Sequence, residues 1–145
     1  MKFSIASLFT ASSALALPST LVARDGFLFL TNYNVRISGL YRTSEISFTL
    51  YDPISYPDDT PTNCTLLWGP IEPPNEDACE NGQYAVRYQG SNLRSYTLEF
   101  ERVSGSIPEK GSVSFSGEDE NYTCSDDTTN PVSTCSYDGP IVVEV

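Results

Sequence analysis

Apolar and polar residues alternate along several short segments of this sequence, and this alternation most constrains the fold. The segments are residues 33–38, 46–50, 84–88, 96–101, 113–115 and 141–145. Successive side chains of a β-strand point to opposite faces, so each segment would have one apolar and one polar face. No helical stripe of apolar residues competes with the pattern. The alternation therefore predicts an all-β chain whose antiparallel sheets bury one face and expose the other.

Clusters of Pro, Gly, Asp and Asn separate these segments and indicate turns, for example at residues 52–53, 73–75 and 139–140. The stretch at residues 117–131 is acidic and polar, which predicts a long solvated loop containing Cys124. The sequence shows neither an internal repeat nor a second domain. About seven or eight short strands with such turns predict a single-domain antiparallel β-barrel or β-sandwich.

The first residues have the three parts of a secretory signal. Lys2 supplies a positive charge, residues 3–17 are apolar and small, and residues 14–16 form an A-x-A cleavage motif. The apolar run is shorter than the roughly 20 residues that span a membrane. We expect a signal peptide at residues 1–16, an N-terminal tail or short pro-segment at 17–25, and a disulfide-stapled β-barrel domain at 26–145. The chain is then secreted and extracellular.

Four cysteines fall into two close pairs, Cys64 with Cys79 and Cys124 with Cys135. In an exported chain such cysteines are typical of disulfides, and four of them allow three connectivities. Local closure would hold segments that are rich in Pro, Asp and Asn, and closing a loop of about fifteen residues restricts the unfolded chain by roughly 3 kcal/mol. The residues therefore favour local pairing, with the other connectivities still open.

Two N-glycosylation motifs are present, at Asn63 and Asn121. Both fit an exported protein, and an occupied site must lie at the surface. The sequence therefore predicts a glycoprotein with two candidate sites.

The formal net charge is −11. Like charges repel, and the sequence has no basic patch, so nucleic acids and anionic membranes are not expected partners. A charge of this sign is more often a source of solubility than a sign of a specific cationic partner.

The chain has no histidine, which removes the usual general base and His-ligated zinc. Glu99 and Glu101 could serve as the two carboxylates of a glycoside hydrolase, but their place opposite apolar neighbours predicts that they face water. A Ca²⁺ site could be built from clustered carboxylates at residues 119, 120, 126 and 127, although a solvated acidic loop is the simpler interpretation. We expect no catalytic residue, no cofactor and no bound metal.

Aromatic residues near predicted loops and strand ends are candidates for partner contact, because such side chains often anchor protein interfaces. These are Tyr51, Tyr56, Trp68 and Tyr122. The competing interpretation is that they cap the ends of the core. A barrel can also hold a small apolar ligand in its mouth, unless side chains fill the interior.

The order of strands and cysteines along roughly residues 33 to 145 is itself informative. It comprises a strand at 35–38 followed by 40–42, a strand at 46–50, Cys64 with Trp68 nearby, then Cys79, strands at 84–88 and 96–100, the second cysteine pair, and a final strand at 141–145. In spacing and pattern this order resembles the fungal family of the Alternaria major allergen.

The resemblance implies a single-domain antiparallel β-barrel with two local disulfides, secreted by a fungus. It also implies an allergen or an elicitor that binds plant defence proteins, without an established enzymatic activity. This chain lacks the additional cysteine that links the allergen's dimer, so we expect a monomer or a non-covalent dimer.

The sequence therefore predicts a secreted, non-catalytic fungal effector or elicitor that binds a host extracellular defence protein and can act as an allergen. The alternative is a small-ligand-binding barrel for a plant phenolic or a pigment.

Overall fold

The chain forms ten β-strands in a computed structural model that describes residues 26–53, 61–69, 76–105, 108–129 and 131–145. The strands are β1 (Phe27–Ser38), β2 (Thr43–Tyr51), β3 (Thr62–Trp68), β4 (Asp77–Ala78), β5 (Tyr84–Asn92), β6 (Ser95–Arg102), β7 (Lys110–Ser116), β8 (Tyr122–Asp127), β9 (Val132–Tyr137) and β10 (Ile141–Glu144). The expected all-β class is confirmed. The described part contains no helix long and apolar enough to cross a membrane.

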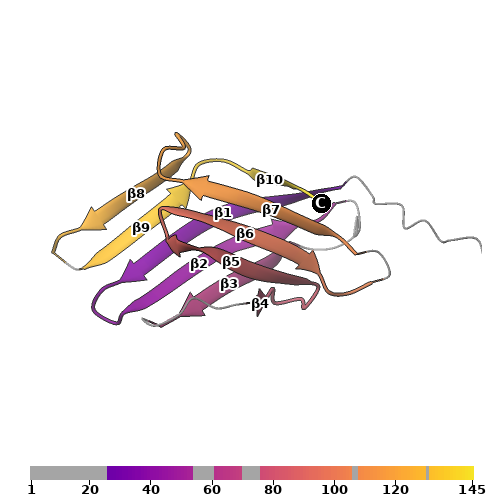
Figure 1. The fold of residues 1–145 in the computed structure, drawn as a ribbon, viewed down its shortest axis with the longest axis horizontal. Coiled ribbons are helices and arrows are strands. Elements are labelled where there is room, and N and C mark those ends of the chain that lie inside the picture. Colours follow the sequence, from indigo (N-terminus) through magenta and orange to yellow (C-terminus); the bar gives the residue numbers. More distant parts are fainter. Residues whose placement is uncertain (1–25, 54–60, 70–75, 106–107, 130) are drawn as a thin grey trace, which may run out of the picture.

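The strands form two antiparallel sheets that face each other (Figure 1). The larger has the order β3-β2-β1-β9-β8, with β10 also paired to β1, and the smaller has the order β4-β5-β6-β7. Every segment that alternates in the sequence lies within one of these strands or reaches its end. Within the described residues no strand pair joins the two sheets, so the fold is an open sandwich rather than a closed barrel.

Aromatic side chains fill the space between the sheets. The ring of Phe115 stacks on Tyr33 with 4.5 Å between centroids and on Tyr96 with 4.9 Å. Phe48 meets Phe100 edge to face at 5.9 Å. These five residues are at most 4% exposed, and the hydroxyls of Tyr33 and Tyr96 satisfy each other by a hydrogen bond. Since aromatic rings bury large apolar areas, they hold the two sheets together.

The two sheets come into close contact where β7 lies beside β10. Gly111 makes this possible, because a Cβ atom built there would collide with the backbone carbonyl of Glu144. A side chain at this position would therefore push β10 away from β7.

The two disulfides have the local pairing, and they connect different parts of the fold. Cys64 of β3 is bonded to Cys79, which follows β4, so this bridge joins the larger sheet to the smaller one. Cys124 and Cys135 are direct cross-strand partners on β8 and β9. The second bridge therefore fastens an edge strand to its neighbour.

The loop expected at residues 117–131 is wrong, because this stretch contains β8, which pairs along its whole length with β9. Most side chains of both strands are polar, and the inward contacts come from the Cys124–Cys135 bridge and from the rings of Tyr122 and Tyr137 at one end of the strand pair. An apolar alternation cannot report such strands. The expected signal peptide and tail, residues 1–25, lie outside the described residues.

Candidate functional site

The four aromatic residues expected at a partner contact have different positions in the structure. Tyr51 is half-buried at the end of β2, and Trp68 is half-buried at the end of β3. Tyr56 lies outside the described residues. Tyr122 is only 2% exposed and its hydroxyl donates to the Leu93 carbonyl at 2.7 Å, so its place as a surface contact is wrong. The start of β8 turns this ring inward against Phe115.

Both candidate glycosylation sites are exposed. Asn63 lies on β3, where its amide donates to Glu80 at 3.4 Å and its oxygen accepts from Thr49 at 3.3 Å. Asn121 comes directly before β8. The described structure leaves both side chains at the surface, and glycan attachment stays a prediction.

Among the described residues, the most exposed large apolar side chains lie together at the tip of the β1–β2 hairpin. Leu40 is 70% exposed and Tyr41 is 75% exposed. The turn is nevertheless held in place, since the Gly39 amide donates to the Pro131 carbonyl at 2.6 Å and the Tyr41 amide donates to Ser38 Oγ at 3.3 Å. A fixed aromatic side chain that projects into water is typical of a binding anchor.

The backbone at this tip has an unusual conformation. Arg42 has φ of 52°, in the left-handed region that glycine adopts freely. Placing a residue with a side chain there costs about 1 kcal/mol, and such positions gather at functional sites. The turn therefore contains an arginine where glycine would fit better.

Two shallow hollows border the tip on the outer face of the larger sheet. One has a volume of about 180 Å³ and is lined with Thr43 and Glu45. The other has a volume of about 370 Å³ and is lined with Leu40, Asp127, Pro131 and Val132. Both share Arg36, Ser38 and Tyr41, so the aromatic ring stands between them. We call Arg36, Ser38, Leu40, Tyr41 and Arg42 the hairpin-tip surface.

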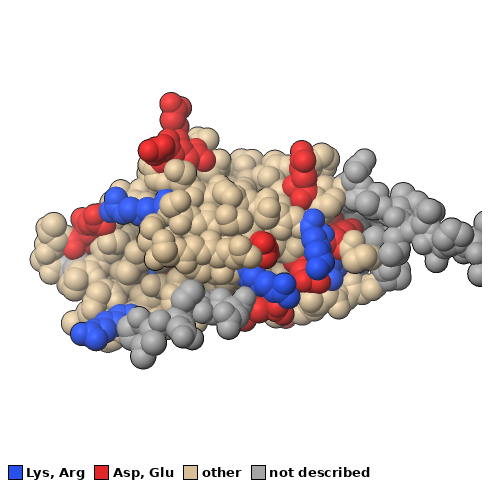
Figure 2. Space-filling model, viewed as in Figure 1, with Lys and Arg blue, Asp and Glu red and all other residues tan. Residues whose placement is uncertain are grey.

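Charge distinguishes this surface from the rest of the described chain. Four cations elsewhere are in ion pairs: Arg87 with Glu76 and Glu101, Arg94 with Asp126, Arg102 with Glu109, and Lys110 with Glu101. Among the described residues, Arg36 and Arg42 form no ion pair. Figure 2 shows a basic group at the end of the molecule that holds the β1–β2 hairpin. The hairpin tip thus presents positive charge on an acidic protein.

A separate hollow of about 260 Å³ opens between the sheets at the same end. Its wall includes Trp68 and Tyr88, whose ring centroids are 5.3 Å apart, together with Ile37 and Leu93. The residues Ser44, Ser91 and Asn92 add polar groups at its rim. This is the mouth of the sandwich, and the aromatic core closes it from below.

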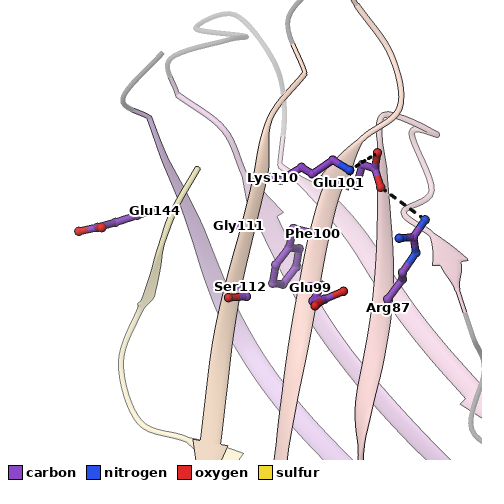
Figure 3. Close-up of a pocket in the computed structure, with 8 residues that line it drawn as sticks. All are labelled: Arg87, Glu99, Phe100, Glu101, Lys110, Gly111, Ser112 and Glu144. Carbon is purple, nitrogen blue, oxygen red and sulfur yellow. Dashed lines mark ion pairs between the residues drawn. The ribbon is translucent and has the colours of Figure 1, made fainter. Parts of the chain in front are cut away.

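The two candidate glutamates lie in a hollow of about 540 Å³ on the outer face of the smaller sheet (Figure 3). The Glu101 carboxylate forms ion pairs with the Lys110 amine at 3.0 Å and with the Arg87 guanidinium at 3.4 Å. The hydrogen bond from Lys110 lowers the pKa of the Glu101 carboxyl below its ordinary value. A general acid needs a raised pKa, so Glu101 is not suited to protonating a leaving group. Both glutamates are half-exposed, as the alternation predicts.

The acidic residues considered for Ca²⁺ do not gather. The described residues contain no group of three or more acidic, His or Cys side chains that could hold a metal ion. Asp126 instead pairs with Arg94 at 3.0 Å.

A buried polar cluster lies at the opposite end of the sandwich. The hydroxyl of Tyr84 is 2.7 Å from an oxygen of Asp52 and 2.8 Å from an oxygen of Glu109. Glu109 also pairs with Arg102 at 3.4 Å, and the Arg102 side chain is only 7% exposed. Burial raises the pKa of the Tyr84 phenol, and the hydrogen bonds to the two carboxylates raise it further. The cluster joins the ends of β2, β5, β6 and β7.

Sequence reasoning did not identify the hairpin-tip surface as a site. It used residues 40–42 only as part of a pattern that follows an early strand. A usable signal was present, because Leu40 and Tyr41 are two large apolar residues placed directly after a turn glycine and before an arginine. Core residues rarely occupy such a position in a short hairpin.

Comparisons with known proteins gave a result only at the level of structure. No protein-family model matches the sequence, and no curated protein matches it. A crystal structure of Alternaria alternata allergen Alt a 1 superimposes with a TM-score of 0.52 at 14% sequence identity, covering 90% of this chain and 94% of that chain. A second crystal structure of the A. alternata major allergen Alt a 1 gives 0.49 at 15% identity, with 83% and 93% covered. The chain therefore has the fold of the Alternaria allergen Alt a 1, as the sequence resemblance predicted.

Proposed function

We propose that this chain is a secreted, allergen-like fungal protein that acts without catalysis by binding a host extracellular protein. The hairpin-tip surface is the contact. The observation that carries the proposal is the exposure of Leu40 and Tyr41 on a turn held in place by two hydrogen bonds, one to a backbone carbonyl and one to the Ser38 hydroxyl. Tyrosine and arginine are the residues that most often dominate the energy of protein interfaces.

Other features support this proposal. The paired cysteines suit an oxidising extracellular environment. The absence of histidine and the ion pair between Glu101 and Lys110 argue against acid–base catalysis. The fold shared with an allergen adds support at the level of architecture alone.

A capture experiment tests the proposal. The tagged protein, secreted from yeast with its disulfides formed, is incubated with plant leaf extracellular fluid, and bound proteins are identified by mass spectrometry. We expect a protein that is captured by the wild type and lost with the double variant Leu40→Ser, Tyr41→Ser.

The matched control is Val103→Ser, which removes another exposed apolar side chain, 55% exposed and outside the hairpin-tip surface. This variant should capture the same protein. If nothing is captured by the wild type from several plants, or if capture survives the double variant, the proposal is wrong.

A second candidate function is favoured by the mouth hollow beside Trp68. The aromatic and aliphatic wall with a few polar groups at its rim is typical of a small-molecule site. A planar phenolic is the class of ligand that would pack against the wall formed by the Trp68 and Tyr88 rings, which contact each other and leave no slot between them. The filled core argues against a ligand deep inside the sandwich, so any ligand would stay at the mouth.

This candidate has a direct readout, because Trp68 is the only tryptophan of the chain. Titration with plant phenolics should quench its fluorescence in a saturable way, beyond the absorbance loss measured with free tryptophan. The variant Tyr88→Leu should weaken that binding. Linear quenching that matches free tryptophan would exclude the mouth as a ligand site.

A further inference from the structure

We infer that the hairpin-tip surface recognises an acidic segment of its protein partner, with carboxylates placed beside an apolar residue. This inference rests on the proposed function and specifies the chemistry of the partner. Leu40 and Tyr41 would contact the apolar residue, and Arg36 and Arg42 would contact the carboxylates.

The cations of this protein differ in whether they form ion pairs. The sequence has 8 Lys and Arg against 19 Asp and Glu, so an arginine that forms no ion pair is unexpected in this protein. Within the described part, the cations that form no ion pair are Arg36 and Arg42, and both belong to the hairpin-tip surface. A guanidinium group presents a planar fork of donors that matches a carboxylate. Charge complementarity therefore selects a partner with negative groups.

Two carboxylates of this chain lie next to the hairpin-tip surface and limit how densely charged its partner can be. Glu45 is the cross-strand partner of Arg36 and lines one hollow, while Asp127 lines the other. Together with a net charge of −11, these carboxylates repel a polymer that carries a charge on every unit. A protein segment can instead place one or two carboxylates between the two hollows and fill the remaining contact with an apolar side chain. The surroundings thus favour an acidic peptide segment over a polyuronate.

Arg42 has a backbone conformation that does not favour an arginine. Its φ of 52° would suit glycine, so the fold gains nothing from an arginine there. Its side chain is exposed and makes no described ion pair, so it does not stabilise neighbouring strands either. A residue that strains the turn without supporting the fold is explained by contact with a partner.

The first test measures capture of the leaf protein as salt is raised. We expect Arg36→Gln and Arg42→Gly each to weaken binding about tenfold, as the loss of one charge-assisted hydrogen bond would. Wild-type binding should fall as NaCl is raised from about 50 to about 300 mM, because added salt shortens the Debye length and screens the charges. The control Arg94→Gln removes an exposed arginine that is paired with Asp126, and it should bind like the wild type.

The outcomes separate the inference from the proposed function. If Tyr41→Ser abolishes capture while the arginine variants bind normally, the partner is not recognised through its charge, and this inference is wrong while the proposed function stands. If neither kind of variant changes capture, both are wrong. Arg42→Gly must be at least as stable as the wild type in thermal unfolding for its binding loss to count as a loss of contact.

The second test does not depend on the leaf protein. Phage-displayed random dodecapeptides are selected on the immobilised wild type and on the double variant Arg36→Gln, Arg42→Gly. We expect enriched peptides that combine Asp or Glu with a large apolar residue, and loss of this acidic enrichment on the double variant. Neutral or basic consensus peptides, or no enrichment that depends on the arginines, would overturn the inference. So would saturable binding of polygalacturonate that the double variant loses.

Discussion

The two ends of the sandwich both contain a tyrosine and an arginine, and they use them in opposite ways. At one end, the Tyr84 hydroxyl lies between two carboxylates and Arg102 pairs with Glu109, all of them buried. At the other end, Tyr41 is 75% exposed and Arg42 forms no ion pair in the described part of the chain. The same residue types therefore serve the fold at one end and remain available to a partner at the other.

The two ends differ in whether their charged and polar groups are buried and paired or exposed and solvated. A buried charge must be paired because water no longer solvates it, so each member of the Tyr84 cluster depends on the others. An exposed charge is solvated and needs no partner for stability. Substitutions should consequently affect stability at the Tyr84 end and binding at the hairpin end, and four measurements can break this contrast.

The largest effect is expected for Arg102→Gln. The substitution removes the buried cation from its ion pair with the Glu109 carboxylate, which typically costs about 3–5 kcal/mol. Urea unfolding followed by Trp68 fluorescence measures the loss in the free energy of unfolding. A change as small as that of the exposed variant Arg94→Gln would show that Arg102 does not hold this end together.

A smaller loss is expected for Tyr84→Phe. The hydroxyl is removed while the ring still fills its place, so the two carboxylates lose a buried donor at a cost of about 1–3 kcal/mol. The same urea experiment measures it. The matched control is Tyr41→Phe, which removes a hydroxyl from an exposed ring and should leave the free energy of unfolding within about 0.5 kcal/mol of the wild type.

Alkaline pH sharpens the comparison further. The pKa of the Tyr84 phenol is raised in the folded protein, so the folded state retains a proton that the unfolded state releases above about pH 10. Stability is therefore intact below pH 10 and falls as pH rises above it, by up to about 1.4 kcal/mol per pH unit for this one group.

The variant Tyr84→Phe lacks this group, so its free energy of unfolding should decline less steeply between pH 10 and 11 than that of the wild type. Urea midpoints at several pH values provide the slopes. Parallel slopes would mean that Tyr84 ionises equally in both states.

The smallest effect has the opposite sign. Arg42→Gly relieves the left-handed conformation at the hairpin tip and should raise the free energy of unfolding by up to about 1 kcal/mol. Thermal unfolding measures the change. A clear loss of stability would indicate that Arg42 supports the turn, and the contrast between the two ends would then fail.

Much of the fold could be predicted because apolar alternation reports a strand whenever its inner face is apolar. This held for β1, β2, β5, β6, β7 and β10. It failed for β8 and β9, where a cysteine bridge and two isolated tyrosines provide the inward contacts, and for β3, whose inner face includes Thr62 and Cys64. The error at Tyr122 had the same origin, because a ring within a polar stretch gives no sign that it turns inward.

The candidate site was less predictable, since exposure depends on neighbours that are distant in the sequence. Whether an arginine is paired is decided by which strands lie beside it: Arg94 meets Asp126 and Arg87 meets Glu76 only because the chain folds back. The sequence alone therefore could not separate Arg42 from Arg102.

The sequence by itself determined the all-β class, the alternation that buries the aromatic core, and the supply of cysteines for two bridges. These follow from the period of a strand and from the chemistry of single residue types, both of which are local properties. Only the tertiary structure decided that the sheets remain an open sandwich, that Tyr84 is enclosed while Tyr41 projects into water, and that two arginines at one tip form no ion pair in the described chain. These depend on which strands become neighbours, because burial and pairing are properties of contacts between distant segments.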